Sequence, residues 1–436
     1  SVGNTNTNKI TLDGDDYVFA GDATFTAKAG DTIDNVGAST VVTDYKTTGG
    51  SAITFAGGTL YIQDATTGVK IDTSTGNGDV TIASVDGDHD ESLTITADSG
   101  AVSVGRIGGS STETATGDGI KTVAITSSTG ITLSGDITTA NADTSSITLT
   151  GPVVISGDVE IDTNTDGTDG TLEFTSTIRG TDNTANNSSK LELDTGTGAI
   201  TFNANTIIGG ATKPLDTLLI NTSDSDEALT IPEIGSGSDA GVLGLVTIGN
   251  TAATPSISMR DALYNFGTGN VSINSAGTTT FSKTDNVGVN LAGGNIAINS
   301  NVTITGGAAA DKDTLDINSG GGNITITGNI AGSDGDEVLI LDDAGAGSGG
   351  VITIGAEGAA ATIGGSNHLK TINLIGAGGV KLSGNITTAA TAGGNVTITG
   401  PVTLVEDIII DADAANTTVS FGSTSTVNSD STSGGH

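Results

Sequence analysis

Apolar and polar residues alternate along short segments through most of this chain. Val302-Thr303-Ile304-Thr305, Ile324-Thr325-Ile326-Thr327 and Val396-Thr397-Ile398-Thr399 show the pattern most plainly. A period of two places one face of a strand inward and the other in water. Clusters of Gly, Asn and Asp separate the segments, as tight turns with positive φ require. No sustained i, i+3, i+4 apolar pattern indicates a helix, so the sequence predicts an all-β protein.

A long stretch of the sequence is written twice. Residues 121–161 recur at 370–410 with a constant offset of 249 residues and no gap. Self-similarity at a fixed spacing indicates a chain that stacks copies of one supersecondary unit. We therefore expect aligned residues of the two copies to be buried alike: Ile137 with Ile386, and Val153 with Val402.

The spacing of the strands favours a parallel β-helix, or β-solenoid. Strand starts in the last third of the chain lie about 20 residues apart, which is too long for two-residue hairpins. This spacing is typical of one coil with two or three short strands, and about 20 such coils would stack in parallel. The alternative is a series of tandem antiparallel β-sandwich domains, which favours a core Trp or Tyr. Aromatic residues are only 3 % of this chain and Trp is absent.

Charge and cysteine content indicate which partners and which cellular location to expect. The chain carries 50 Asp and Glu against 14 Lys and Arg, a net charge of −36. Such a surface repels nucleic acid and anionic membranes and attracts cations. The absence of cysteine excludes disulfide and thiol chemistry and favours an exported protein. No apolar run approaches the ~18 residues of a membrane span, so we expect an extracellular or cell-surface protein without nucleic-acid partners or membrane insertion.

The two ends differ from the repetitive body at residues 62–422. Residues 1–61 hold half of the 12 aromatic residues and are interpreted as an N-terminal cap or docking segment. Residues 423–436 are rich in Ser, Thr and Gly and are interpreted as a flexible tail. The aromatic residues of the N-terminal segment are Tyr17, Phe19, Phe25, Tyr45, Phe55 and Tyr61.

Acidic corners are the one candidate for ion chemistry. Alternating carboxylates on Gly-containing turns suit Ca²⁺, which takes six to eight oxygen ligands in flexible geometry. The alternative without a bound ion is that these corners are solvated loops that keep the protein soluble. No cofactor is required, and calcium is the candidate ligand. The predicted ligands are Asp86, Asp88, Asp90 and Glu91 in one corner, and Asp334, Asp336 and Glu337 in a second.

Catalytic chemistry has little support in the sequence. The chain has three His and three Arg, and no metal triad or Ser-His-Asp set can be assembled with a spacing argument. We therefore predict that the protein is not an enzyme and assign no catalytic or cofactor-binding residue. Two alternatives stay open. One is a calcium-dependent carbohydrate or ice-binding module, suggested by the acidic corners and by Thr-x-Thr pairs; the other is a polysaccharide lyase.

Two short motifs recur and carry a resemblance. Ile-Gly-Gly occurs at 107, 208 and 363, and Gly-Gly-Asn at 293, 321 and 393. With the strand pattern over residues 60–428, the chain resembles repetitive bacterial surface exoproteins of the filamentous-haemagglutinin and β-strand-repeat kind. The resemblance implies an exported, right-handed parallel β-helix with adhesive, stalk or surface-layer roles and no catalytic residues.

We therefore expect an extracellular structural or adhesive protein, namely an adhesin stalk, a fibre subunit or a surface-array component. Its expected partners are further copies of itself in a head-to-tail assembly and a cell-surface or matrix polysaccharide. Head-to-tail contacts are expected because a solenoid ends in unpaired strand edges that need covering.

Overall fold

A computed structural model describes residues 1–436 except a set of short segments. These segments are 37–41, 64–66, 110–118, 140–144, 164–169, 182–188, 211, 222–226, 284–285, 307–312, 344, 346–348, 366, 390–393, 413–416 and 430–436. The chain divides into two compact units, unit 1 from Ser1 to Ile207 and unit 2 from Ile208 to His436. Strand β23 (Ile207–Ile208) lies at the division.

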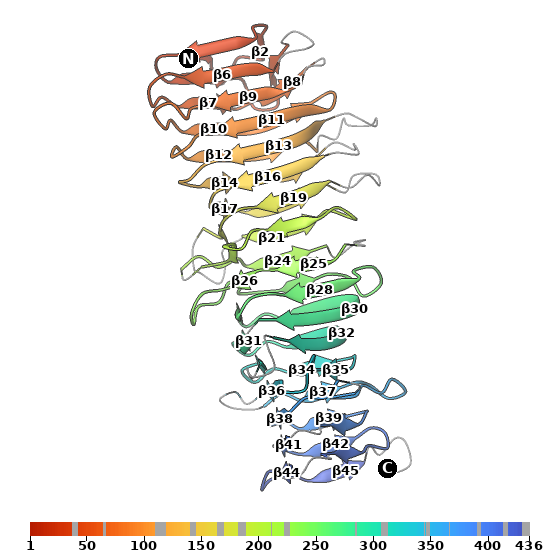
Figure 1. Cartoon of the computed structure of the whole chain (residues 1–436). Coiled ribbons are helices and arrows are strands. Elements are labelled where there is room, and N and C mark those ends of the chain that lie inside the picture. Colours follow the sequence, from red (N-terminus) through yellow and green to blue (C-terminus); the bar gives the residue numbers. More distant parts are fainter. Residues whose placement is uncertain are drawn as a thin grey trace. The chain divides into compact units, whose positions relative to one another are not determined.

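Unit 1 consists of short strands stacked turn upon turn in three parallel ladders (Figure 1). The first ladder contains β1 (Val2–Gly3), β4 (Ala23–Thr26), β7 (Ile53–Ala56), β10 (Val80–Gly87), β12 (Val102–Ile107), β14 (Ile131–Leu133), β17 (Val153–Ile155) and β20 (Ile178–Arg179). The second contains β2 (Lys9–Leu12), β5 (Thr32–Asn35), β8 (Thr59–Ile62), the far ends of β10 and β12, β15 (Ile137–Thr138), β18 (Asp158–Asp162) and β21 (Lys190–Asp194). The third contains β3 (Asp16–Phe19), β6 (Thr43–Thr47), β9 (Val69–Asp72), β11 (Glu91–Thr96), β13 (Ile120–Thr126), β16 (Ser146–Thr150), β19 (Thr171–Phe174) and β22 (Ile200–Phe202).

Unit 2 is built in the same way (Figure 1). One ladder contains β24 (Thr217–Ile220), β27 (Val246–Ile248), β30 (Val271–Ser282), β32 (Ile296–Thr305), β34 (Ile324–Ile326), β37 (Ile352–Ile354), β39 (Val380–Leu382), β42 (Val402–Leu404) and β45 (Val427–Ser429). A second contains β26 (Glu233–Ile234), β29 (Leu263–Phe266), β31 (Asn286–Leu291), β33 (Thr314–Asn318), β36 (Val338–Asp342), β38 (Thr371–Ile375), β41 (Asn395–Thr399) and β44 (Thr418–Phe421). The third contains β25 (Leu229–Ile231), β28 (Ser256–Met259), the far ends of β30 and β32, β35 (Ile330–Ala331), the bridge residue Ile363, β40 (Ile386–Thr387) and β43 (Ile410–Asp411).

The alternation of the sequence sets the interior of each turn. In β38 the pattern Thr-Ile-Asn-Leu-Ile places Ile372 and Leu374 in the core and the residues between them at the half-exposed surface. β-Branched side chains suit such a pleated, half-buried surface. The predicted all-β parallel solenoid is thus confirmed, and no helix occurs among the residues that the structure describes.

The length of a turn differs from the sequence estimate. The structure contains about 15 turns with a spacing of about 25 residues, where the sequence suggested about 20 residues and about 20 turns. The estimate counted distances between successive strong strands, and some of these belong to the same turn. Each turn actually contains up to three strands and a variable corner loop, and only ladder pairing reveals which strands lie one turn apart.

The two copies of the repeated section, residues 121–161 and 370–410, fold alike. Ile137 pairs with Ile161 in unit 1, and Ile386 pairs with Ile410 in unit 2, both at the 249-residue offset. All four residues of the predicted pairs are buried: Ile137, Ile386, Val153 and Val402. The prediction that the copies are structural equivalents is confirmed at these positions.

Gly-Asn corners join successive turns in unit 2. The side-chain Oδ1 of Asn295 accepts the backbone N–H of Asn323, and the Oδ1 of Asn323 accepts that of Val351, each at 2.8 Å. The preceding glycines let the turns approach, because a Cβ at Gly322 would lie 2.0 Å from the carbonyl oxygen of Gly294. The Gly-Gly-Asn motif at 293 and 321 is therefore a stacking device, with Gly for close backbone contact and Asn for capping the next turn.

The Ile-Gly-Gly motif makes a second kind of close contact. At 107 and 363 the Ile is buried and the first Gly has a positive φ. A Cβ on Gly108 would lie 2.1 Å from the carbonyl oxygen of Thr138, and one on Gly364 would lie 1.8 Å from that of Thr387. The two Thr residues occupy the same place in the two copies, so the motif holds each copy to the turn before it.

The predicted terminal segments take part in the ladders. Residues 1–61 form β1 to β8, apart from the segment outside the description, and β4, β6 and β8 pair onward with β7, β9 and β10. Several of their aromatic rings pack together inside these turns, with Tyr17 stacked on Tyr45 at 4.9 Å and Phe25 on Phe55 at 5.0 Å. Their role as a cap or docking segment stays a prediction. Of the predicted tail, Val427–Ser429 forms β45 and pairs with β42, while residues 430–436 lie outside the described part.

Candidate functional sites

The first acidic corner lies between β10 and β11 in unit 1. Glu91 begins β11 and is fully buried, and both of its carboxylate oxygens accept the backbone N–H of His89, at 3.0 and 3.1 Å. Ligand-type atoms of Asp88, His89 and Glu91 lie within 4.8 Å of one another. Burial raises the pKa of Glu91 to about 8, the His89 N–H opposes this shift, and the neighbouring Asp88 adds to it.

The other two predicted ligands of this corner form ion pairs. Asp86 lies 3.3 Å from a guanidinium nitrogen of Arg106, and Asp90 lies 3.6 Å from the Nζ of Lys121. The structure thus brings together Asp88 and Glu91 with His89, which the sequence had not assigned. Because Glu91 is largely protonated at neutral pH, a cation bound there would have to displace its proton.

The second corner lies between β35 and β36 in unit 2 and brings all three predicted ligands together. Ligand-type atoms of Asp334, Asp336 and Glu337 lie within 4.8 Å of one another. Glu337 is fully buried and accepts the N–H groups of Asp334 and Gly335 at 2.9 Å each, as well as the N–H and hydroxyl of Ser333. Here burial also disfavours the charged form, but these donors outweigh it and lower the pKa of Glu337.

The contrast between the two buried glutamates follows from the number of donors. Glu337 is surrounded by donors in its loop, whereas the donors that lower the pKa of Glu91 are the backbone N–H groups of His89 and of Glu91 itself, and they do not outweigh its burial. Because loop donors already occupy the carboxylate oxygens of Glu337, the carboxyl groups that remain to bind a cation at the second corner are those of Asp334 and Asp336. A hydrogen bond between their carboxyl groups raises the pKa of Asp334 to about 6. Two carboxylates held this close at the surface repel each other unless a proton or a cation lies between them.

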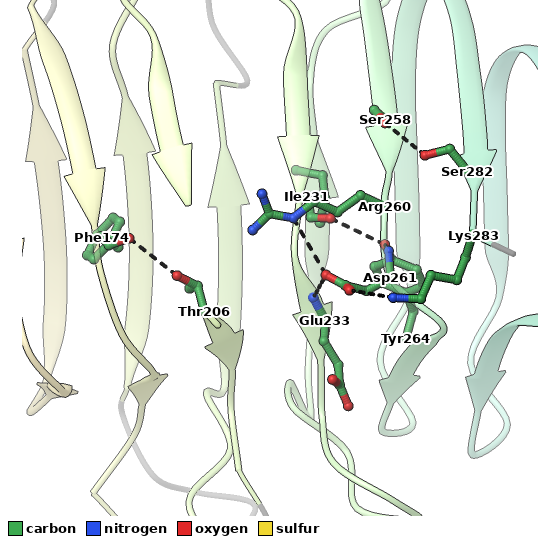
Figure 2. A network of polar contacts seen from close by, with 10 residues as sticks. All are labelled: Phe174, Thr206, Ile231, Glu233, Ser258, Arg260, Asp261, Tyr264, Ser282 and Lys283. Atoms are coloured by element: carbon green, nitrogen blue, oxygen red, sulfur yellow. Dashed lines mark hydrogen bonds and ion pairs between the residues drawn. The ribbon is translucent and has the colours of Figure 1, made fainter. Parts of the chain in front are cut away.

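A charged network that the sequence did not reveal surrounds Asp261 in unit 2 (Figure 2). One carboxylate oxygen of Asp261 accepts the backbone N–H of Glu233 at 3.1 Å and lies 3.6 Å from Nε of Arg260. The other oxygen lies 3.5 Å from Nζ of Lys283. The backbone N–H of Asp261 donates to the hydroxyl of the buried Tyr264 at 2.9 Å.

This network joins three turns rather than forming an acid–base pair around a cleft. Asp261 caps the N–H of Glu233 in the preceding turn, whereas the corner asparagines cap the following turn, and in Figure 2 the Glu233 carboxylate points away from the other charges. Burial and the charge of Asp261 raise the pKa of Glu233, while Lys283 lowers it. Residues this far apart in sequence meet only because the turns stack. The signal available in the sequence was an Asp two residues before a strand, Asp261 before β29.

One open cavity of about 330 Å³ lies on unit 2. Its wall includes two acidic residues, and the carboxylate of one of them, Glu406, already accepts the N–H of Gly358 at 2.9 Å. Among the residues that the structure describes, no basic or aromatic side chain contributes to the lining. The lining residues are Ala360, Thr362, Ser383, Gly384, Asn385, Glu406 and Asp407.

The outward Thr residues do not form a continuous array. In the ladder that passes through β34, β37 and β39, Thr325 and Thr353 are followed by Lys381. In unit 1, Glu173 lies between Thr148 and Thr201. An ice-binding face needs a flat, uniform array, so charged side chains within these columns weaken that alternative.

Comparison with protein families, curated proteins and solved structures finds no match for this chain. Over the described residues, no helix has the length and apolar character needed to cross a membrane.

Proposed function

We propose that this protein is an extracellular structural or adhesive protein, acting as an adhesin stalk, a fibre subunit or a surface-array component. The observation that carries the proposal is the repetition of the same turn. Aliphatic residues fill the interior, and Thr and Asn hold most of the outward positions, as in β38 and β41. A surface that repeats at each turn suits a spacer or an array better than a single reactive site does.

Composition supports the extracellular assignment. The net charge of −36 keeps such a protein soluble and surrounds it with cations, and the chain has no thiol to protect. The likeness to filamentous-haemagglutinin and β-strand-repeat exoproteins rests on the Ile-Gly-Gly and Gly-Gly-Asn corners, which hold the turns together. We assign no catalytic role, since the residues around Asp261 serve to join turns.

Two partners belong to this proposal. Further copies of the chain assemble end to end in a head-to-tail manner, and a cell-surface or matrix polysaccharide contacts the polar outer columns through their hydroxyl and amide groups. Neither partner needs a preformed pocket, because the polysaccharide would contact columns that recur along the solenoid and a second copy would contact the strand edges at its end.

Immunogold electron microscopy of intact source cells tests the location. We expect label on the cell exterior, in rows or patches, and loss of the label when intact cells are treated with protease. An antibody to a cytosolic protein is the control for leakage. Label confined to the cytoplasm would contradict the proposal.

Calcium binding at the second corner is a second candidate function. The observation in its favour is the close pair of surface carboxylates, Asp334 and Asp336. Calcium at ten times its Kd would stabilise the fold by about 1.4 kcal/mol, or a Tm rise of about 2–4 °C. Calorimetry at matched ionic strength measures this rise, which Asp336→Asn should abolish and the exposed Asp239→Asn should retain. Equal Tm values with calcium and with chelator would leave the corner as a solvated loop.

A further inference from the structure

In the described part of the chain, one set of corner residues is acidic in unit 1 and neutral in unit 2. Each lies directly before a buried apolar residue, and its side-chain Oδ1 accepts a backbone N–H of the following turn at 2.8–3.2 Å. A carboxylate makes the stronger cap, because a charged acceptor strengthens a hydrogen bond. Capping alone therefore does not account for the neutral residues. The acidic caps are Asp22, Asp79 and Asp136, and the neutral ones are Asn270, Asn295, Asn301, Asn323, Asn329, Asn385 and Asn395.

The two copies of the repeated section show this difference at one aligned position. Asp136 precedes Ile-Thr in the first copy, and Asn385 precedes Ile-Thr in the second. Repulsion between stacked carboxylates does not require a neutral residue here, because the turns on either side of Asn385 place Thr362 and Ile409 in the same column. What the asparagine adds is the sequence Asn-Ile-Thr, and Asn-x-Ser/Thr is the acceptor sequence of N-linked glycosylation.

Four exposed corner asparagines of unit 2 have this acceptor sequence. In each case the Asn and the hydroxyl residue two positions later lie on the same outward face, because the buried residue between them points inward. Two further Asn-x-Ser/Thr sequences lack this exposure: Asn221 is fully buried, and Asn395 is half-buried at the start of β41. The four exposed sequences are Asn270-Val-Ser, Asn301-Val-Thr, Asn323-Ile-Thr and Asn385-Ile-Thr.

The cap occupies Oδ1 of these asparagines and leaves Nδ2 at the surface. None of the four Nδ2 atoms donates a hydrogen bond to a residue that the structure describes. By contrast, Nδ2 of Asn295, which lacks the acceptor sequence, donates to Oδ1 of Asn270 at 3.1 Å. A glycosylated asparagine keeps Oδ1 as an acceptor, so the cap on the next turn survives the modification.

The transfer itself uses Nδ2 and a sugar activated as a diphosphate ester. A bond forms between Nδ2 and the anomeric carbon of the sugar, and the bond from that carbon to the phosphate oxygen breaks. The diphosphate leaves with the electron pair, and Nδ2 gives up one of its two protons. The co-reactant is therefore a glycosyl diphosphate, which the glycosylation machinery of the source cell would supply.

The stacking of the turns leaves space between the acceptor residues of one column. Asn270 and Asn323 are two turns apart, with Asn295 in the turn between them. Asn301 and Asn385 are three turns apart in a second column, which also contains Asn329. At about 4.8 Å per turn, the members of each pair lie about 10–14 Å apart. The intervening Asn295 and Asn329 are each followed two positions later by Ala, so adjacent turns of these columns do not both have the acceptor sequence.

We propose that Asn270, Asn301, Asn323 and Asn385 carry N-linked oligosaccharides. This inference rests on the proposed extracellular function, because acceptor sequences of this kind are glycosylated on exported proteins. The sugar chains would project from two corner columns of unit 2, where they add bulky, solubilising groups to a surface of short polar side chains.

Mass spectrometry of peptides from the protein purified from its source cells tests the proposal. Fragmentation that keeps the sugar on the peptide assigns it to one asparagine. We expect a sugar mass on all four sites and none on Asn295 and Asn329, which form the same cap without a hydroxyl residue two positions later. Unmodified peptides at all four sites overturn the proposal.

Variants produced in the source cells separate the acceptor sequence from the cap. Thr325→Val keeps the shape and outward position of the side chain and should abolish the sugar on Asn323, whereas Thr325→Ser should retain it. Asp136→Asn completes an acceptor sequence in unit 1, since Thr138 is already in place, and should gain a sugar. Circular dichroism and Tm confirm that each variant folds.

A sugar that persists on Asn323 in Thr325→Val also overturns the proposal. Failure here is distinguishable from failure of the proposed function. Immunogold label outside the cell together with unmodified peptides would reject the glycosylation alone, whereas label confined to the cytoplasm would reject the extracellular function.

Discussion

The two copies of the repeated section have the same register but different burial on one side. Ile155 and Ile161 of the first copy are fully buried, whereas their counterparts Leu404 and Ile410 in the second are half-exposed. The sequence around each pair is similar, so the difference comes from the following turns: β20 and β21 complete the cover in unit 1. An inward position in a solenoid is therefore a property of the stack, and burial is completed only by the neighbouring turn.

The largest expected effect contrasts the two copies at one aligned position. Ile161→Ala should lower the free energy of unfolding by about 3 kcal/mol, because it opens a cavity in a covered turn. Ile410→Ala should cost about 1 kcal/mol or less, since Ile410 is already half-exposed. Chemical denaturation followed by circular dichroism measures both. Equal losses would show that the two copies share the same environment after all.

A somewhat smaller effect is expected where the copies agree. Gly108→Ala and Gly364→Ala each force a Cβ against the backbone of Thr138 or Thr387 and strain a positive φ. Each substitution should lower the free energy of unfolding by about 2–3 kcal/mol, and the two losses should be similar. Gly210→Ala is the control, because a Cβ there meets nothing within 4 Å. A loss in only one of the two variants would mean that the close contact is not shared.

The turns that precede the two copies should differ in how much their stability depends on pH. Ala97 precedes the first copy, and the equivalent residue before the second is Asp343, which is fully buried. One carboxylate oxygen of Asp343 accepts the N–H of Ala377 at 2.7 Å, and the other has no hydrogen-bond partner. Burial raises the pKa of Asp343 to about 6, and the charge of Asp342 adds to this.

Stability should fall as the pH rises, because the folded state favours the neutral form of Asp343. Asp343 contributes stability below about pH 4, and this contribution is lost as the pH rises through about 6. Asp343→Asn keeps the acceptor without the charge, so the variant should gain about 2 kcal/mol on the unmodified protein at pH 7.5 and little at pH 4. Denaturation at both pH values measures the difference, with Asp239→Asn as the control. The same gain at both pH values would rule out titration of Asp343 as its cause.

The smallest effect concerns a corner that both copies share. The Oδ1 of Asp136 accepts the N–H of Glu160 at 2.9 Å, and the Oδ1 of Asn385 accepts that of Ile409 at 2.8 Å. Asp136→Ala and Asn385→Ala should each cost about 1 kcal/mol. The pKa of Glu160 is raised by burial and then by Glu192, Asp162 and Asp136. Asp136→Asn should therefore stabilise the fold by a few tenths of a kcal/mol at neutral pH, and a loss near that of the Ala variant would contradict this reasoning.

The candidate sites were predicted in part. The sequence proposed Asp334, Asp336 and Glu337 as one corner, and their ligand-type atoms lie close together because neighbours on one tight turn have little freedom to separate; calcium binding there stays a prediction. It did not foresee that Asp86 and Asp90 would form ion pairs with Arg106 and Lys121, since those partners come from the next turns. Nor did it reveal the network around Asp261, for the same reason.

The sequence by itself determined the class of fold and the kind of interior. The alternation of Ile, Val and Leu with Thr fixes strands and their inward faces, and the ungapped repeat fixes which residues are equivalent, because both depend on local periodicity. Only the tertiary structure decided the length of a turn, the ion pairs and which inward residues are actually covered. Those depend on which strands become neighbours across a turn of about 25 residues, and variable corner loops leave that pairing open until the turns are stacked.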